Sequence, residues 1–327
     1  MSTPLLEVKG LEIELRISGK ETVKAVEHVS FALDPGRTLG IVGESGCGKS
    51  LTVSSILGLL PQGVGKITGG QILFDGTDLA ALSSSQLRRY RGKHISMIFQ
   101  DPMTSLNPVH TIQRQLTEML RSHSKISKKE AHIKGAELLD LVGIPAAKER
   151  MKDYPHQLSG GMRQRVMIAM AVSSGPQILI ADEPTTALDV TIQAQILELM
   201  KDLNKRMGTS ILLITHDMGV ISETADDVAV MYAGRIIEYA PVRELFLNPL
   251  HPYTVGLLKS IPRMDRETED LYTIEGTVPP LNAMSKGCRF SNRCPECTEL
   301  CKTREPPVLR IGSHEIACWK YEKKSIV

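Results

Sequence analysis

Residues 158–165, Leu158-Ser159-Gly160-Gly161-Met162-Arg163-Gln164-Arg165, restrict the fold more narrowly than any other stretch of this chain. Ser159 and the two glycines stand just before a helix that we expect to begin near Met162. At such a helix start, unpaired backbone N–H groups and the positive end of the helix dipole can face an anion. The chain has a second phosphate-binding pattern, and we do not expect both to reach one phosphate within a single copy. The pair therefore predicts a dimer.

That second pattern, Gly43-Glu44-Ser45-Gly46-Cys47-Gly48-Lys49-Ser50, fills every fixed position of G-x-x-x-x-G-K-S. It follows an apolar strand (39–42) and precedes a helix that we expect to extend through Leu60. The glycines let backbone N–H groups surround phosphate oxygens, Lys49 brings a positive charge to the outer phosphates, and Ser50 offers a hydroxyl to Mg²⁺. The predicted nucleotide-binding residues are Gly43, Glu44, Ser45, Gly46, Cys47, Gly48, Lys49, Ser50 and Leu51.

The composition is that of an ordinary globular protein. The 327 residues are 42% hydrophobic and 23% charged, which suits one large domain or two. A net charge of +2 gives no reason to expect a nucleic acid as the ligand. The first residues lack the regions of a signal peptide, and no apolar run approaches the roughly 20 residues that cross a bilayer. We therefore expect a cytosolic protein.

The spacing of apolar residues changes three times along the chain. The first hundred residues read as strands broken by turns, residues 101–157 have helical spacing, and apolar strands then alternate with an amphipathic helix. Such alternation predicts a parallel sheet covered on both sides. Beyond residue 240, repeated prolines predict an irregular tail. The expected strands are 11–17, 25–33, 38–42, 71–74, 95–99, 177–182 and 210–215, and the later helix is 191–207.

Polar side chains stand where three of these apolar strands end. Asp182 and Glu183 close one strand, so Asp182 can help to hold Mg²⁺ and Glu183 can polarise the attacking water. His216 ends the next strand and is a candidate donor to the γ-phosphate. Gln100 follows another strand and could sense Mg²⁺ and water. Taken singly, each could be a cap or a surface residue; their combination with Ser50 favours a catalytic edge.

Five of the six cysteines lie in the last 40 residues. In a reducing compartment such clustering favours metal binding over disulfides. Four thiolates can hold tetrahedral zinc or a [4Fe-4S] cluster, and the spacing matches neither common zinc nor common ferredoxin patterns. Zinc, a cluster and packed reduced thiols all remain open at this point. The candidate ligands are Cys288, Cys294, Cys301 and Cys318, with Cys297 as an extra thiol.

In order and spacing these motifs, together with Ala187-Leu188-Asp189, resemble an ABC transporter ATP-binding subunit over about residues 5–240. Residues 99–108, the stretch His251-Pro252-Tyr253-Thr254 and the cysteine tail are similar to the ATPase subunits of bacterial oligopeptide, dipeptide and nickel importers. The resemblance implies an α/β P-loop NTPase fold with a mainly parallel core sheet, an N-terminal antiparallel β subdomain, a helical insertion and an irregular Cys-rich tail. The implied domains are the ATPase core (1–100 and 159–240), the helical subdomain (101–158) and the C-terminal extension (241–327).

The resemblance also implies how the chain works. In a head-to-tail dimer, one subunit's signature would close on ATP and Mg²⁺ held by the other, with Asp189 at the seam; the signature residues are Ser159, Gly160, Gly161 and Gln164. Glu183, His216 and Gln100 would be catalytic, and Ser50, Gln100 and Asp182 would bind Mg²⁺. Among the cysteine alternatives, the resemblance favours [4Fe-4S] over Zn²⁺.

The expected partners follow from the same resemblance. They are a homologous ATPase subunit, giving a heterodimer, two membrane-spanning permease subunits and an extracytoplasmic solute-binding protein, with this chain on the cytoplasmic face of the membrane. The function would be ATP-driven import of di- or oligopeptides, nickel or a related small solute. The alternatives are a soluble ABC ATPase without a membrane partner and a redox-regulated ABC ATPase. No nucleic acid is expected.

Overall fold

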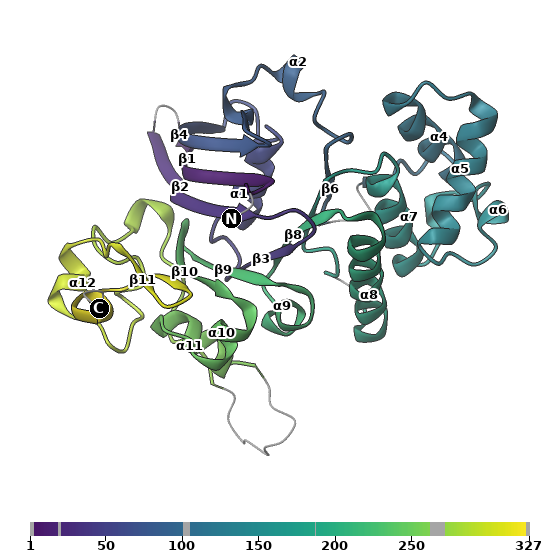
Figure 1. Ribbon diagram of the computed structural model, residues 1–327. Coiled ribbons are helices and arrows are strands. Elements are labelled where there is room, and N and C mark those ends of the chain that lie inside the picture. The colour runs from purple at the N-terminus through teal and green to yellow at the C-terminus, as the bar shows by residue number, and fades with distance from the viewer. Residues whose placement is uncertain (1–2, 19–20, 101–104, 187, 262–271, 325–327) are drawn as a thin grey trace. The chain divides into compact units, whose positions relative to one another are not determined.

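The structure is a computed structural model that describes residues 3–18, 21–100, 105–186, 188–261 and 272–324 (Figure 1). Motif residues 101–104 and Ala187 therefore lie outside the described residues. The chain divides into two compact units, which we describe separately. Unit 1 comprises Met1–Asp34, Thr38–Ala81 and Ile214–Val327, and unit 2 comprises Pro35–Arg37 and Leu82–Leu213.

An antiparallel sheet of order β2-β1-β4-β5 forms one part of unit 1, and its three long strands lie side by side in Figure 1. The apolar alternation in β1 changes phase, with Leu6 and Val8 buried before Gly10 and Leu11 and Ile13 buried after it. Gly10 has φ +55° at a register shift, so a β-bulge keeps both pairs on the core face. The bulge explains why the strand begins earlier than residue 11. The strands are β1 (Leu6–Ser18), β2 (Glu21–Leu33), β4 (Gly65–Phe74) and β5 (Thr77–Asp78).

The remaining strands of unit 1 follow the order β11-β12-β10-β9-β3. β3 (Thr38–Val42) pairs in parallel with β9 (Asp227–Tyr232), and β10 (Arg235–Pro241) pairs antiparallel with β9. All five β3 residues are buried, as expected for a strand covered on both faces. The tail adds a hairpin, β11 (Val308–Ile311) and β12 (His314–Ala317), and β12 pairs with β10. The C-terminal extension is thus continuous with this sheet.

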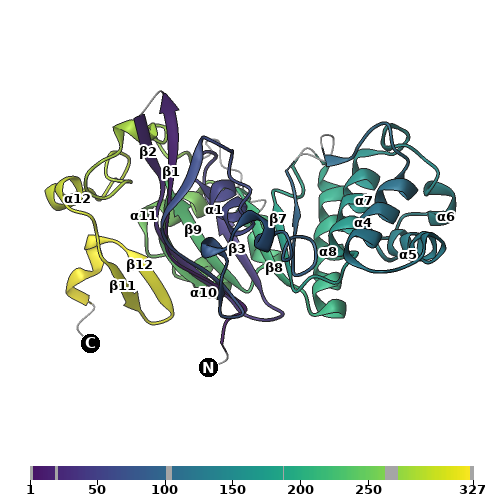
Figure 2. The same cartoon turned by 90° about the horizontal axis from the view of Figure 1, so that it is seen from above.

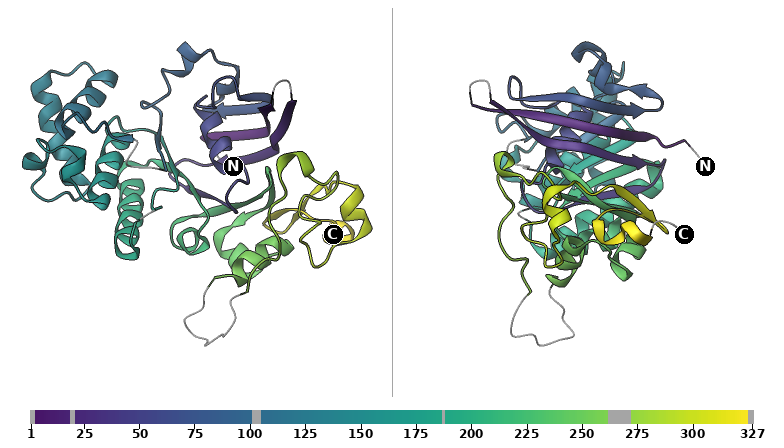
Figure 3. Two further views of the ribbon diagram at one scale, coloured as in Figure 1. Left: turned by 180° about the vertical axis from the view of Figure 1, so that it is seen from behind. Right: turned by 90° about the vertical axis from the view of Figure 1, so that its left-hand side faces the viewer.

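Short helices accompany these strands. The expected helix through Leu60 is wrong, because α1 (Lys49–Ile56) ends where Gly58 takes φ +58°. The tail expected to be irregular contains α10 (Val242–Leu247), α11 (Pro252–Lys259) and α12 (Glu299–Thr303). Pro252 starts α11 because proline suits a first helical turn. Figure 3 shows the yellow tail beside the green segment that carries β10, α10 and α11. The unit also contains α9 (Met218–Thr224).

Unit 2 combines buried strands with the helical insertion. β6 (Ile95–Ile98) pairs in parallel with β7 (Ile178–Asp182), and β8 (Ser210–Thr215) neighbours β7. The helices α4, α5 and α7 lie together in Figure 2, and Leu116 and Leu139 are fully buried among them. The expected helix at 191–207 is confirmed, with Gly208 at its end. The helices are α2 (Ser84–Leu87), α4 (Ile112–His123), α5 (Lys128–Leu141), α6 (Ala147–Arg150), α7 (Gly160–Val172) and α8 (Val190–Met207).

Brief 3-10 turns complete the described structure at Leu79–Ala81, Pro155–Gln157, Leu281–Ala283 and Trp319–Lys324. Within the described ranges, no helix has both the length and the apolar character needed to cross a membrane.

Candidate active site

The phosphate-loop pattern lies where the sequence predicts it, between β3 and α1 of unit 1. Gly46 and Gly48 have φ of +78° and +100°, which side chains rarely permit. A Cβ on Gly43 would stand 2.1 Å from the carbonyl oxygen of Met231, so backbone contact excludes any side chain there. Ser50 is exposed at the first turn of α1. The loop therefore has the conformation and the open helix start that phosphate binding needs.

Lys49 is almost fully buried, and its ammonium group bonds to its own loop. Nζ donates to the carbonyl oxygens of Gly43, at 2.6 Å, and of Glu44, at 3.0 Å. The two carbonyl dipoles stabilise the positive charge of Lys49 within the loop, and neither of these two bonds goes to a carboxylate. The neighbouring Cys47 is 1% exposed, and burial raises the pKa of its thiol. Cys47 is therefore an uncharged packing residue of the loop.

Two residues from the C-terminal extension hold Glu44 in this loop. Its backbone N–H donates to Oη of Tyr253 at 3.0 Å, and its carboxylate accepts from Nη1 of Arg293 at 3.0 Å to each oxygen. We did not predict either contact. The stretch His251-Pro252-Tyr253 carried a family signal, but Arg293 had no local signal beyond its place between two cysteines.

The predicted base lies at the end of β7 in unit 2. Asp182 is buried as the last strand residue, and Glu183 follows it with φ +48°. This left-handed conformation costs a non-glycine residue about 1–2 kcal/mol, and such strain is typical of functional sites. Glu183 Oε2 accepts hydrogen bonds from Gln100 Nε2 at 2.9 Å and from Thr186 Oγ1 at 3.0 Å. The structure therefore brings Gln100 and Glu183 together and adds Thr186, which we did not predict.

His216 follows β8 and belongs to unit 1, together with the phosphate loop. Its side chain is exposed directly after buried Thr215. The next residue, Asp217, has a local role, because its Oδ1 accepts from the backbone N–H of Gly219 at 2.7 Å and caps α9. His216 is therefore presented by a fixed turn between β8 and α9.

The signature residues form the start of α7. The helix begins at Gly160, earlier than the expected Met162, because Ser159 is its N-cap and accepts from the Met162 N–H at 3.3 Å. A Cβ on Gly161 would lie 2.7 Å from Cγ2 of Ile192 in α8, so the close packing of two helices requires glycine there. Gln164 is only 1% exposed, and among the described residues its Nε2 has no hydrogen-bond partner. It faces the protein interior.

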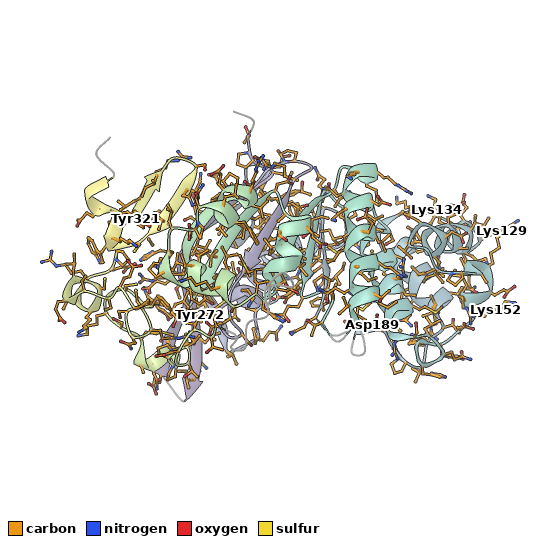
Figure 4. The ribbon with its side chains drawn as sticks, turned by 90° about the horizontal axis from the view of Figure 1, so that it is seen from below. Lys129, Lys134, Lys152, Asp189, Tyr272 and Tyr321 are labelled. Carbon is orange, nitrogen blue, oxygen red and sulfur yellow. The ribbon has the colours of Figure 1, made fainter. Side chains whose placement is uncertain are left out.

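Asp189, the expected seam residue, is exposed at the start of α8, as Figure 4 shows. Its Oδ1 accepts from the Ile192 N–H at 2.9 Å. The carboxylate therefore caps the same helix that packs against Gly161, which links the start of α8 to the start of α7 through Ile192.

Four of the five clustered thiols line one cavity of about 450 Å³ in unit 1. Burial raises the pKa of Cys288 to about 12 and that of Cys294 to about 11, and it also raises the pKa of Cys318. Without a metal these three thiols are protonated at neutral pH. Cys297 is not part of the lining; its Sγ donates to the carbonyl oxygen of Thr298 at 3.5 Å. The cavity cysteines are Cys288, Cys294, Cys301 and Cys318, the four predicted from the sequence.

Comparison with known proteins identifies the family of this chain. The family model for ABC transporters matches residues 26–186, and that for the oligopeptide/dipeptide transporter C-terminal region matches residues 237–301. The oligopeptide transport ATP-binding protein AppD of Bacillus subtilis is 53% identical over 99% of this chain and 98% of its own. The dipeptide transport ATP-binding protein DppD of the same organism is 52% identical over 98% of this chain and 96% of its own.

Solved structures give the same answer for the fold. The dimeric structure of MJ0796, a bacterial ABC transporter cassette, has a TM-score of 0.65 and 28% identity, and it covers 73% of this chain and 99% of that one. The predicted fold class is thus confirmed. With more than half of its residues identical to those of full-length relatives, the chain belongs to the ABC transporter ATP-binding proteins of the oligopeptide and dipeptide transporter family.

Proposed function

We propose that the chain is the subunit that binds and hydrolyses ATP for the import of di- and oligopeptides through separate membrane subunits. The observation that carries this proposal is the identity of 51–53% with peptide transport ATP-binding proteins across nearly the whole of each chain. The names of these relatives refer to oligopeptides, dipeptides or peptides, so the nickel alternative gains no support from them.

The residues of unit 1 would bind the nucleotide. The turn from Gly43 to Ser50 offers backbone N–H groups to the phosphates, Lys49 supplies the charge, Ser50 meets Mg²⁺ and Leu51 continues the helix start. His216, exposed at its turn, would contact the γ-phosphate. Membership of the ABC ATPase family fits this use of ATP and Mg²⁺.

The residues of unit 2 would act on the attacking water. Asp182 would help to hold Mg²⁺, and Glu183 would accept the proton of the water. The bonds from Gln100 and Thr186 fix the orientation of the Glu183 carboxylate. Through the bond from Gln100, a change at Glu183 could move Gln100 and the helical subdomain that follows it in the chain.

The signature would complete the site in a second subunit. Ser159 caps a 13-residue helix and Gly160 begins it, so backbone N–H groups there can meet phosphate oxygens. Similar solved structures are described as dimeric, one of them bound to ADP and Pi, which supports a dimer. In our proposal the two subunits would pair head to tail, with Asp189 at the seam. Buried Gln164 would support the signature from within rather than touch ATP. We infer that the second subunit is a homologous, different ATPase chain.

The remaining partners follow from the same assignment. Two membrane-spanning permease subunits would receive the movement of the ATPase pair, and an extracytoplasmic solute-binding protein would deliver the peptide. The chain would sit on the cytoplasmic face of the membrane, and the helical subdomain would be residues 101–158. The ATPase core (1–100 and 159–240) and the extension (241–327) would complete the domain plan.

A [4Fe-4S] cluster in the thiol cavity is part of this proposal, with Zn²⁺ as the alternative. Among the residues that the structure describes, no group of three or more His, Cys, Asp or Glu side chains is arranged to hold a metal ion. Four thiols line the cavity of about 450 Å³, and a [4Fe-4S] cluster takes four cysteine ligands. The cluster would be held by Cys288, Cys294, Cys301 and Cys318. Its contribution would be structural, because bonds to four thiolates would cross-link the tail.

The decisive experiment replaces the base and keeps its size. Glu183→Gln retains the bonds from Gln100 and Thr186 as an amide oxygen but cannot accept a proton at neutral pH. We expect ATP binding close to that of the wild type and kcat reduced by about 10²–10⁴-fold. Steady-state hydrolysis and ATP-driven dimerisation, measured with the membrane subunits present, test this. Turnover at the wild-type rate by the variant would show that Glu183 is not the catalytic base. Uptake of labelled peptide by the reconstituted complex tests the proposed substrate.

A further inference from the structure

The seven residues from Cys288 to Cys294 join the thiol cavity to the ATPase part of unit 1. Both end cysteines line the cavity. Between them, Arg289 pairs with Glu27 and donates to the carbonyl oxygen of Ala233, and Arg293 pairs with Glu44 of the phosphate loop. Each arginine therefore fixes this short segment to a different part of the core, and only Arg293 reaches the loop that would hold the phosphates.

The guanidinium of Arg293 is held on several sides. Its side chain is 6% exposed, and Nη1 lies 3.0 Å from both carboxylate oxygens of Glu44. Nε and Nη2 donate to the carbonyl oxygens of Glu275 and Ile274 at 2.9 Å and 3.2 Å. The guanidinium also lies 5.8 Å from the centre of the Tyr232 ring. A planar cation fixed in this way determines where the Glu44 side chain lies.

Tyr253 holds the main chain of the same residue. Its ring is fully buried and packs edge-on against Tyr232 and Phe290, with ring centres 4.7 Å and 5.3 Å apart. Its hydroxyl oxygen accepts the Glu44 N–H at 3.0 Å. Burial raises the pKa of Tyr253 well above its usual range, so the hydroxyl stays neutral at physiological pH. Residue 44 is thus fixed through its backbone by α11 and through its side chain by the cysteine segment.

Glu44 in turn carries one of the two anchors of Lys49. The ammonium donates to the carbonyl oxygens of Gly43 and Glu44. A change in the position of Glu44 therefore changes the position of the charge that the loop offers to a phosphate. The path from Arg293 through Glu44 to Lys49 consists of two direct contacts, each with polar atoms 3.0 Å apart.

We propose that Arg293 and Tyr253 are positioning residues for nucleotide binding, which act by holding Glu44 and through it the phosphate loop. This inference rests on the proposed function, because it assumes that the loop binds ATP. The Cys-rich extension would then shape the nucleotide site indirectly. The described contacts join the extension to the phosphate loop, and the extension need not touch the nucleotide.

A double-mutant cycle tests the path. The measured quantity is the Kd for the Mg²⁺ complex of a non-hydrolysable ATP analogue, on full-length protein with its normal partners. We expect Arg293→Gln to raise Kd about 3- to 20-fold, and the same change to have at least a threefold smaller effect in a Glu44→Gln background. Arg293→Lys keeps the positive charge but lacks the several N–H donors of the guanidinium. Its Kd should therefore lie between those of the wild type and Arg293→Gln. Tyr253→Phe keeps the ring packing and should raise Kd less than Arg293→Gln does.

A second readout separates positioning from loss of structure. KM for ATP should rise with Kd while kcat at saturating ATP stays within about twofold of the wild type, because the substitution leaves the proposed catalytic residues unchanged. Arg310→Gln is the matched control, since Arg310 is a 79% exposed arginine of the same extension. Its Kd should equal that of the wild type. Equal values for Arg293→Gln and Arg310→Gln, or equal effects in both Glu44 backgrounds, would overturn the inference.

Lys49→Ala distinguishes this inference from the proposed function. Loss of binding in Lys49→Ala with normal binding in Arg293→Gln would defeat only the positioning role. Normal binding in Lys49→Ala would instead mean that the loop is not the nucleotide site, and the proposed function would fail first.

Discussion

The phosphate loop and the thiol cavity belong to the same unit but are built in opposite ways. The loop consists of eight consecutive residues between β3 and α1, and its shape follows from local spacing and from glycines. The cavity collects four thiols from three separate parts of the tail, and its shape depends on how that tail folds. The difference teaches that a contiguous motif can specify a site by itself, whereas a dispersed one specifies only the residues that could take part.

The largest effect should come from the loop. Gly43→Ala places a Cβ 2.1 Å from the Met231 carbonyl oxygen, a backbone atom that cannot turn away. The loop must shift, and a misplacement of this size can lower kcat/KM for ATP by about 10²-fold. Gly69→Ala is the control, because its Cβ would meet only the flexible Glu12 side chain at 3.4 Å. ATPase rates close to those of the control would show that the loop tolerates more than local geometry suggests.

The cavity offers a contrast between neighbouring thiols. Cys294 lines it and Cys297 does not, although only three positions separate them. Cys294→Ser should remove the visible absorption expected of anaerobically purified protein with a bound cluster, and Cys297→Ser should keep it. Trp319, the single tryptophan, also lines the cavity and provides a second signal through its fluorescence. Identical spectra for the two variants would contradict the assignment of the four ligands.

Local chemistry explains which parts of this molecule could be predicted from sequence. The loop from Gly43 to Ser50, the pair Asp182-Glu183 and the helix after Asp189 each depend on residues that are close in the chain. The structure places all three as expected. Two of the differences are also local, because Gly58 ends α1 early and the Ser159 cap starts α7 early. Glycine is typical of helix C-termini and serine of helix N-caps, so both boundaries have a signal in the sequence.

The contacts on Glu44 could not have been found in this way. Arg293 lies 249 positions from Glu44 and Tyr253 lies 209 positions from it. Nothing in the spacing of the cysteines shows that the residue before Cys294 faces the phosphate loop. The bond from Gln100 to Glu183, across 83 positions, was equally hidden, although both residues were predicted to be functional. Sequence spacing identifies residues with suitable chemistry, but only the tertiary structure shows which of them contact each other.

The signature is a third case. It is a contiguous motif, but glycine is required at position 161 because Ile192 of another helix packs against it. Gly161→Ala brings a Cβ to 2.7 Å from Ile192, whereas Gly160→Ala meets Leu188 at an ordinary 3.8 Å. Overpacking should cost Gly161→Ala about 1–3 kcal/mol, seen as a lower Tm of the isolated chain. Gly160→Ala should leave Tm nearly unchanged. Equal Tm values would mean that Ile192 can move aside, and Gly161 would then be needed only for the nucleotide.

The last effect concerns how the cysteine segment is held to the sheet, and it depends on pH. Arg289 and Arg235 both contact the carboxylate of Glu27, whose side chain is 15% exposed. Burial by itself would raise the pKa of Glu27, but the bond from Arg235 and the two arginine charges lower it to about 2. Because the folded-state pKa is depressed, this carboxylate stabilises the fold above its unfolded pKa of 4.5 and loses that effect as the pH falls toward 2.

Glu27→Gln should therefore be less stable than the wild type by at most about 3 kcal/mol at pH 6, and this difference should shrink as the pH falls from 4.5 toward 3. Glu198→Gln is the matched control, since Glu198 is 64% exposed in its pair with Lys201 and should show no such trend. Thermal unfolding at several pH values measures both variants. A difference that stays constant from pH 6 to pH 3 would show that Glu27 acts by packing alone. A shrinking difference would show that the extension, unlike the glycine-built loop, is held to the core by charge.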